Sequence, residues 1–216
     1  MSAITATRSG LCARVSLLLT ISLGLSGLGT YMGRNLNGGA LIVTMVAFIA
    51  GVFIVPLIAR RSDQGGTIAL GAWTFVSGLF IAPAIAQYSH QLGWQTVCLA
   101  YIGTAGVMAV CGAIGAFSGK DFSGMGRTLM LALFALIIVG VVGIFVSLGQ
   151  AGNIIYSLLG MVVFAGFFIF DFFRLSRSSN TTYNAVTVTM SLYLDFINFL
   201  LFFLRFLGSS SGSSKK

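Results

Sequence analysis

Acidic residues are scarce in this sequence, which contains four aspartates and no glutamate among 216 residues. Charged residues of both signs make up 7% of the chain, whereas hydrophobic residues make up 57%, and the mean hydropathy is +1.00. No water-soluble domain of this length tolerates so few charges. The net charge of +8 does not indicate nucleic-acid binding, because the basic residues form no patch with interleaved aromatics. The composition therefore indicates an integral membrane protein.

Cysteine and histidine are also rare, which excludes several kinds of site. The three cysteines, Cys12, Cys98 and Cys111, are odd in number and lack a Cys-x-x-Cys spacing, so they indicate neither a disulfide framework nor a metal cluster. The single histidine, His90, has no acid near it in the sequence, and we interpret it as a solvated loop residue. No dinucleotide-binding, zinc-protease or serine-hydrolase motif is present. We therefore expect no cofactor and no enzymatic activity.

Seven apolar segments account for nearly the whole chain, and each is long enough to cross a bilayer, which takes about 20 residues. We predict transmembrane helices at roughly 14–33, 40–59, 67–88, 96–117, 128–148, 153–175 and 184–206. The domain organisation is then an N-terminal cytoplasmic arm at 1–13, a seven-helix transmembrane domain at 14–207 and a flexible Ser-rich tail at 208–216. No Ala-x-Ala-like cleavage site follows the first apolar run, so we expect an uncleaved first span.

The basic residues predict the orientation of the chain in the membrane. With the N-terminus inside, the inner segments hold eight of them, whereas the three outer loops hold only Arg34. Seven spans place Lys215 and Lys216 outside, against this rule, and a re-entrant last segment would return them to the cytoplasm. Seven full spans remain the simpler interpretation.

Small residues recur at four-residue spacing in two parts of the sequence. They form the series Ser22, Ser26, Thr30, the pair Gly29 and Gly33, and the pair Gly115 and Gly119. Small residues at this spacing let neighbouring membrane helices approach closely. We interpret these series as packing inside one bundle rather than as a dimer motif, and we expect a monomer.

Two of the four aspartates, Asp171 and Asp195, lie inside apolar segments, whereas we expect Asp63 and Asp121 in short polar loops beside basic residues. A carboxylate in hydrocarbon is costly, so an intramembrane acid usually faces the protein interior and has a function. We therefore place the candidate site on the last two helices.

Asp195 belongs to a polar stripe in the last segment. The stripe consists of Asn184, Thr187, Ser191, Asp195 and Asn198, whose gaps of three, four, four and three residues place them on one helix face. Such a face must contact protein or a water-filled cavity. It could supply a functional site, or it could hold the bundle together through interhelical hydrogen bonds.

Asp171 lies near the end of the sixth segment, where it could pair with Arg174 or Arg177 as a boundary ion pair. A short loop joins the sixth and seventh segments, so the alternative is that Asp171 meets Asp195. Two carboxyls brought together in a low dielectric cannot both ionise cheaply, and such a pair would share a proton. Without that proton, its oxygens suit a hard cation such as calcium.

The segment Leu-Tyr-Leu-Asp-Phe-Ile-Asn at 192–198, followed by Leu-Arg-x-x-Gly at 204–208, resembles the last helix of the Bax inhibitor motif family of membrane proteins. The resemblance is closest to bacterial members described as pH-sensitive calcium-leak proteins. It implies an all-α fold with two three-helix layers around a central C-terminal helix, in a bacterial cytoplasmic membrane. It also implies that Asp171 and Asp195 form a hydrogen-bonded pair. The chain departs from the family in one place, because Phe170 and Phe172 flank Asp171 where many members have Tyr and Thr.

In the family, an arginine at the inner end of the second helix latches onto the aspartate pair, and that helix moves as a gate. The corresponding residue here is Arg60, with Arg61 as the alternative. The expected function is a passive calcium leak, with Asp171 and Asp195 as pH sensor and transient calcium ligands. The residues Thr187, Ser191 and Asn198 are then supporting polar groups. The expected partners are membrane lipid, calcium ions and protons.

Three other functions stay open at this point. Some bacterial relatives are thought to restrain a membrane-anchored AAA protease, which would make the chain an interaction protein. A cation/proton antiporter would need a counter-ion flux. An intramembrane aspartyl protease of the presenilin type would need Gly-x-Gly-Asp, but the sequence before Asp195 is Leu192-Tyr193-Leu194, without a glycine, and the Pro-Ala-Leu element is also missing.

Overall fold

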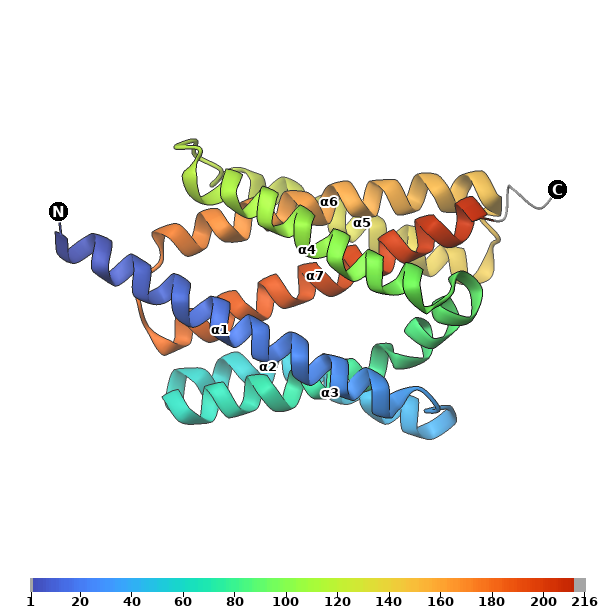
Figure 1. Cartoon of the computed structure of the whole chain (residues 1–216), viewed down its shortest axis with the longest axis horizontal. Helices are drawn as coiled ribbons and strands as arrows, with labels where there is room; N and C mark the ends of the chain where they lie inside the picture. The colour runs from blue at the N-terminus through green and yellow to red at the C-terminus, as the bar shows by residue number, and fades with distance from the viewer. Residues whose placement is uncertain (1, 212–216) are drawn as a thin grey trace. The chain divides into compact units, whose positions relative to one another are not determined.

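The computed structural model describes residues 2–211, with side chains described for residues 10–210, and it contains no β-strand within that range. Its elements are α1 (Ser2–Gly33), α2 (Gly38–Arg61), α3 (Asp63–Leu92), α4 (Trp94–Phe117), α5 (Met125–Phe145), α6 (Gly149–Arg177) and α7 (Thr182–Ser211), shown in Figure 1. All seven are long and apolar enough to cross a membrane. The predicted all-α membrane fold is therefore confirmed.

The helix ends differ from the prediction where polar residues continue a helix. Asp63 opens α3 and His90 lies exposed in its last turn, so neither is the loop residue that the sequence predicted. An acid in the first turn favours a helix electrostatically. The last helix, α7, continues to Ser211, so residues 208–211 of the predicted tail are helical. The rest of that tail, 212–216, lies outside the described residues, as does Met1.

The chain divides into two compact units, each built from three helices and part of α7. Unit 1 comprises residues 1–87 and 175–193, and unit 2 comprises residues 88–174 and 194–216. The last helix contributes residues 182–193 to unit 1 and residues 194–211 to unit 2. It is also the most buried helix, because 61% of its most apolar stretch is buried, compared with 11% for the corresponding stretches of α2 and α5. This agrees with the predicted central C-terminal helix.

In unit 1, α1 and α3 approach each other through glycines. A Cβ atom on Gly29 would collide with the backbone oxygen of Phe75, and one on Gly78 would collide with the backbone oxygen of Ser26. Thr30 also donates a hydrogen bond across this contact, from its hydroxyl to the Gly78 carbonyl at 3.3 Å. The small residues predicted on α1 therefore pack inside the bundle, as expected.

In unit 2, glycines make room for phenylalanine rings of neighbouring helices. A Cβ atom on Gly160 would overlap the ring of Phe202, and one on Gly112 would lie 2.9 Å from the ring of Phe172. Gly115 packs directly against the backbone of α6, whereas its predicted companion Gly119 follows the end of α4 with φ +70° and nothing near it. The abundance of both residue types, 28 glycines and 19 phenylalanines, is explained in part by these pairings.

Candidate functional site: an aspartate pair on the last two helices

Asp171 on α6 and Asp195 on α7 meet inside unit 2. Both are buried, with 3% and 6% of their surfaces exposed, and a hydrogen bond joins their side chains. Ionised carboxylates only accept hydrogen bonds, so this bond requires one proton on the pair. The structure thus brings together the two acids that the sequence placed inside apolar helices, in an arrangement that holds a proton between them.

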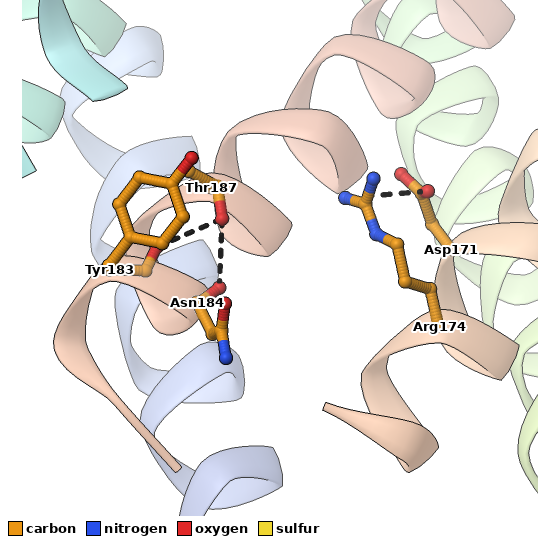
Figure 2. Close-up of polar contacts among 5 residues, drawn as sticks. All are labelled: Asp171, Arg174, Tyr183, Asn184 and Thr187. Carbon is orange, nitrogen blue, oxygen red and sulfur yellow. Dashed lines mark hydrogen bonds and ion pairs between the residues drawn. The ribbon is translucent and has the colours of Figure 1, made fainter. Parts of the chain in front are cut away.

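A cation accompanies this aspartate pair. The Nη2 atom of Arg174 lies 3.7 Å from Oδ1 of Asp171, one turn along α6, as Figure 2 shows. The arginine side chain is 42% exposed and the aspartate side chain 5%, so the arginine reaches from a more accessible position to a buried carboxyl. Two carboxyls with one proton and one guanidinium carry no net charge. The sequence presented this ion pair and the pairing with Asp195 as alternatives, and the structure contains both.

One oxygen of the pair lacks a hydrogen-bond partner among the described residues, and it is Asp195 Oδ2. A buried polar atom in this condition costs about 1–3 kcal/mol, which calls for an explanation. A bound calcium ion needs six to eight oxygens, and within the described residues no group of three His, Cys, Asp or Glu side chains could hold a metal. The two carboxyls alone therefore supply fewer oxygens than a calcium ion takes.

The two phenylalanines that flank Asp171 pack into neighbouring helices. A Cβ atom on Gly126 of α5 would lie 2.7 Å from the ring of Phe170, and one on Gly112 of α4 would lie 2.9 Å from the ring of Phe172. These rings wedge α6 between α4 and α5 and so fix the direction in which Asp171 projects. The missing Tyr and Thr hydroxyls are thus replaced by packing contacts, while Asp195 and Arg174 supply polar contacts to the carboxyl.

The polar residues at the start of α7 bond to nearby backbone. The hydroxyl of Thr187 donates to the backbone oxygens of Tyr183 at 2.9 Å and Asn184 at 3.3 Å (Figure 2). The amide of Asn184 donates to the backbone and side-chain oxygens of Ser179. These bonds are local to α7 and the loop before it, and they are not the interhelical bonds that the sequence offered as an alternative.

In unit 2, the last residue of the stripe behaves in the same way. The amide of Asn198 donates to the Leu194 backbone oxygen of its own helix at 2.8 Å. Four residues of the stripe are half-buried, namely Asn184, Thr187, Ser191 and Asn198, whereas Asp195 is buried. The stripe is therefore the less buried face of α7, with the acid as its most enclosed member.

Arg60, the predicted latch, contacts the beginning of α7 within unit 1. Its Nη2 atom donates to the hydroxyl of Tyr183 at 3.1 Å, and its guanidinium carbon lies 5.1 Å from the centre of that ring. A second arginine, Arg14 of α1, donates to the Thr182 hydroxyl at 2.9 Å. The alternative latch residue, Arg61, is exposed. A bond between Arg60 and the aspartate pair stays a prediction.

The sequence did not single out Tyr193, which lies two residues before Asp195. Its side chain is fully buried in unit 1, and its hydroxyl lies 2.7 Å from the hydroxyl oxygen of Ser26 and 2.9 Å from that of Ser77. The ring packs edge-on against Trp73, with 5.5 Å between centroids. The spacing of Ser22 and Ser26 on α1 indicated a packing face but gave no sign of this polar contact.

Comparison with known proteins identifies the family. The family described as "Inhibitor of apoptosis-promoting Bax1" matches residues 8–212. The uncharacterized protein YrjE of Lactococcus lactis is 31% identical over 123 residues, 54% of this chain and 52% of that protein. An uncharacterized membrane protein of Streptococcus pyogenes is 29% identical over 119 residues, 52% of each chain.

A third relative, the "Golgi anti-apoptotic protein" of vaccinia virus, is 37% identical over 94 residues, 44% of this chain and 39% of that protein. Each match spans about half or less of the relative's length. The family match, in contrast, covers nearly all of the present sequence and all seven helices. The chain therefore belongs to the Bax inhibitor family of multi-pass membrane proteins.

Proposed function

We propose that this protein is a pH-sensitive passive calcium leak of the bacterial cytoplasmic membrane, with its N-terminus in the cytoplasm. The observation that supports this best is the buried, hydrogen-bonded pair of Asp171 and Asp195. Carboxyl oxygens are the ligands that calcium prefers, and a shared proton competes with a cation for them. A group of this kind makes cation passage depend on pH without any enzymatic step.

Loss of the shared proton changes the charge of the pair. With the proton and with Arg174 nearby, the group is neutral, and without the proton it carries one uncompensated negative charge. An uncompensated charge in a buried place attracts whichever cation can reach it. Asp195 Oδ2 is the oxygen in this group that has no hydrogen-bond partner among the described residues. We assign it as the oxygen that a passing calcium ion contacts.

Besides calcium, Arg60 is a second cation that could neutralise this negative charge. Its contact with Tyr183 is exposed and of the cation–π and hydrogen-bond kind, which costs little to break. Its helix, α2, is one of the two least buried helices, so few packed side chains hold it in place. In the proposed cycle, Arg60 exchanges Tyr183 for the ionised aspartate pair, and the bridge holds α2 in the position that blocks passage.

This cycle predicts the sign of the pH response. Arginine bridges an ionised carboxylate and gains nothing from a protonated one. The blocking bridge is therefore favoured at high pH, and the leak increases as pH falls. A leak that increases with pH would contradict the blocking role of Arg60.

The experiment is calcium influx into liposomes that contain the purified protein, followed with an entrapped indicator at several pH values. Asp195→Asn keeps the size of the side chain but cannot ionise, so we expect its leak to lose its pH dependence. Asp121→Asn, in the exposed loop between α4 and α5, is the matched control and should behave as the wild type.

Two results would sink the proposal. One is an unchanged flux and pH response for Asp195→Asn. The other is calcium movement that requires an opposing proton gradient, since this would indicate an antiporter. Adding a protonophore distinguishes a passive leak from an antiporter, because a passive leak continues when the proton gradient is collapsed.

A further inference from the structure

Arg205 is a charged residue inside the membrane-spanning helix α7, and it has no role in the proposed leak. Its Nη2 and Nε atoms lie 2.7 Å and 3.3 Å from Oδ1 of Asn153, on α6. Its guanidinium carbon lies 4.7 Å from the centre of the Tyr156 ring. All three residues belong to unit 2. An amide and an aromatic ring orient the guanidinium but do not neutralise its charge.

The charge of Arg205 has no carboxylate partner in the described part of the chain. Its contacts are with the Asn153 amide oxygen and the Tyr156 ring, and neither is a carboxylate. Asn153 accepts from two of the five N–H groups of Arg205, which leaves three for another acceptor. An arginine in a membrane helix is expensive unless an anion or water accompanies it. The arrangement therefore favours an anionic ligand.

The height of Arg205 along its helix matches the level of lipid phosphates. It lies six residues before Ser211, which is about 9 Å along the helix, and Asn153 lies about 6 Å from the start of α6 at Gly149. With 30 residues, α7 is about 45 Å long, whereas the hydrocarbon core is about 30 Å thick. The helix ends thus extend into the head-group region, and Arg205 lies near its border.

An apolar groove runs beside this cation between α5 and α6. It has a volume of about 380 Å³ and is lined by Ala135 and Val139 on one side and by Ile155 and Leu159 on the other. Tyr156, whose ring makes the cation–π contact with Arg205, also lines the groove. Ile155 and Leu159 are more than half exposed, so the groove opens to the surroundings of the protein, which in a membrane are acyl chains.

We propose that Arg205 and this groove form a binding site for an anionic phospholipid. The phosphate group accepts hydrogen bonds from the free N–H groups of Arg205, and one acyl chain lies in the groove between α5 and α6. Asn153 and Tyr156 hold the guanidinium in the orientation that faces the phosphate. The selectivity of the site comes from the charge, because the groove alone accepts the acyl chain of any lipid.

The test is native mass spectrometry of the detergent-solubilised protein titrated with phosphatidylglycerol or with phosphatidylcholine of the same acyl chains. We expect the wild type to retain phosphatidylglycerol preferentially. Arg205→Gln should weaken that binding about fivefold, as expected for one basic residue near an anionic lipid. Arg205→Lys, which keeps the charge, should recover most of it.

Arg34→Gln is the matched control. Arg34 also lies over a tyrosine ring, at 4.9 Å from the centre of Tyr31, and likewise has no carboxylate partner among the described residues, but it does not adjoin the groove. Its loss should leave phosphatidylglycerol binding unchanged. Equal losses for the two variants would show general charge attraction and would overturn the proposal.

Ala135→Phe fills the groove and keeps the charge, so it should also weaken phosphatidylglycerol binding. Glycerol 3-phosphate tests the phosphate without acyl chains. If it competes as well as the lipid does, the site binds free phosphate, and the proposal is wrong. A wild type that retains both lipids equally would refute the proposal even if every variant failed to fold.

Discussion

At the scale of single residues, three ionisable side chains of unit 2 are grouped around one shared proton. Asp171, Asp195 and Arg174 together are neutral when the two acids share a proton. Removing one member of such a group leaves a buried charge uncompensated, which is far more costly than losing the attraction itself. A change of one charge at this place can therefore shift a conformational equilibrium.

Tyr183 provides a test of the proposed exchange of Arg60. Tyr183→Leu removes both the ring and the hydroxyl that hold Arg60, so Arg60 should bridge the aspartate pair more readily and the leak should fall about threefold at a fixed pH, as expected for an exposed cation–π contact. Liposome calcium influx measures this effect, and Tyr183→Trp, which keeps a ring face, should restore the rate.

Tyr31→Leu is the control for Tyr183→Leu, because it removes the same kind of contact from Arg34. It should leave the leak rate unaltered. In an Arg60→Gln background, Tyr183→Leu should also have no effect, since its partner is gone. A threefold loss that persists in that background would assign Tyr183 a structural role and not one in holding the latch.

The sequence indicated the two aspartates because a carboxylate in an apolar helix is anomalous by itself. It could not choose between Arg174 and Asp195 as the partner of Asp171, because helix spacing allows the first and the loop allows the second. It missed the contacts of Tyr193 and the Tyr183–Arg60 contact, since tyrosines in helices are common and their partners lie over 100 residues away.

At the scale of helices, close packing depends on where glycines face a neighbour. Gly29 and Gly27 lie two residues apart on α1, but a Cβ atom on Gly29 would meet the backbone of α3, whereas a Cβ atom on Gly27 would meet nothing within 4 Å. Composition alone cannot separate these two positions. Their difference arises only when α1 and α3 are packed.

Gly29→Ala should destabilise the protein by about 1–3 kcal/mol, because the backbone of α3 cannot yield as a side chain would. Gly27→Ala should be neutral or slightly stabilising, because alanine favours a helix by up to about 1 kcal/mol over glycine. Thermal unfolding in detergent measures both. Equal effects of the two substitutions would contradict the packing of α1 on α3.

Helix ends were predicted less well than helix centres. Apolar runs mark where a helix lies in hydrocarbon, but polar residues such as Asp63 and the serines after Gly208 continue the same helix beyond that region. Their backbone bonds form regardless of whether the side chain is apolar. Hydropathy therefore predicted the membrane-embedded part of each helix and underestimated the length of α1, α3, α6 and α7.

At the scale of the whole molecule, the last helix is shared by both units. Its residues 182–193 include Tyr193 with its serine contacts in unit 1, and its residues 194–211 include Asp195 with its acidic partner in unit 2. Because only one residue, Leu194, separates these two sites on a continuous helix, a rotation of α7 would strain both sets of polar contacts.

The orientation of the chain can be tested with single cysteines in a background that lacks Cys12, Cys98 and Cys111. The distribution of Lys and Arg predicts that His90→Cys is labelled by a membrane-impermeant maleimide in intact cells, and that Asp121→Cys is labelled only after permeabilisation. Both positions are exposed, so reactivity reports sidedness. The reverse pattern would place the N-terminus outside.

The pairing of glycines with phenylalanine rings has a consequence for how the sequence can diverge. Gly112 faces the ring of Phe172, and Gly160 faces the ring of Phe202. A larger residue at either glycine is compatible with the fold only when the facing ring becomes smaller. Across relatives, these positions should therefore vary in compensating pairs, with summed side-chain volume as the preserved quantity and neither residue invariant by itself.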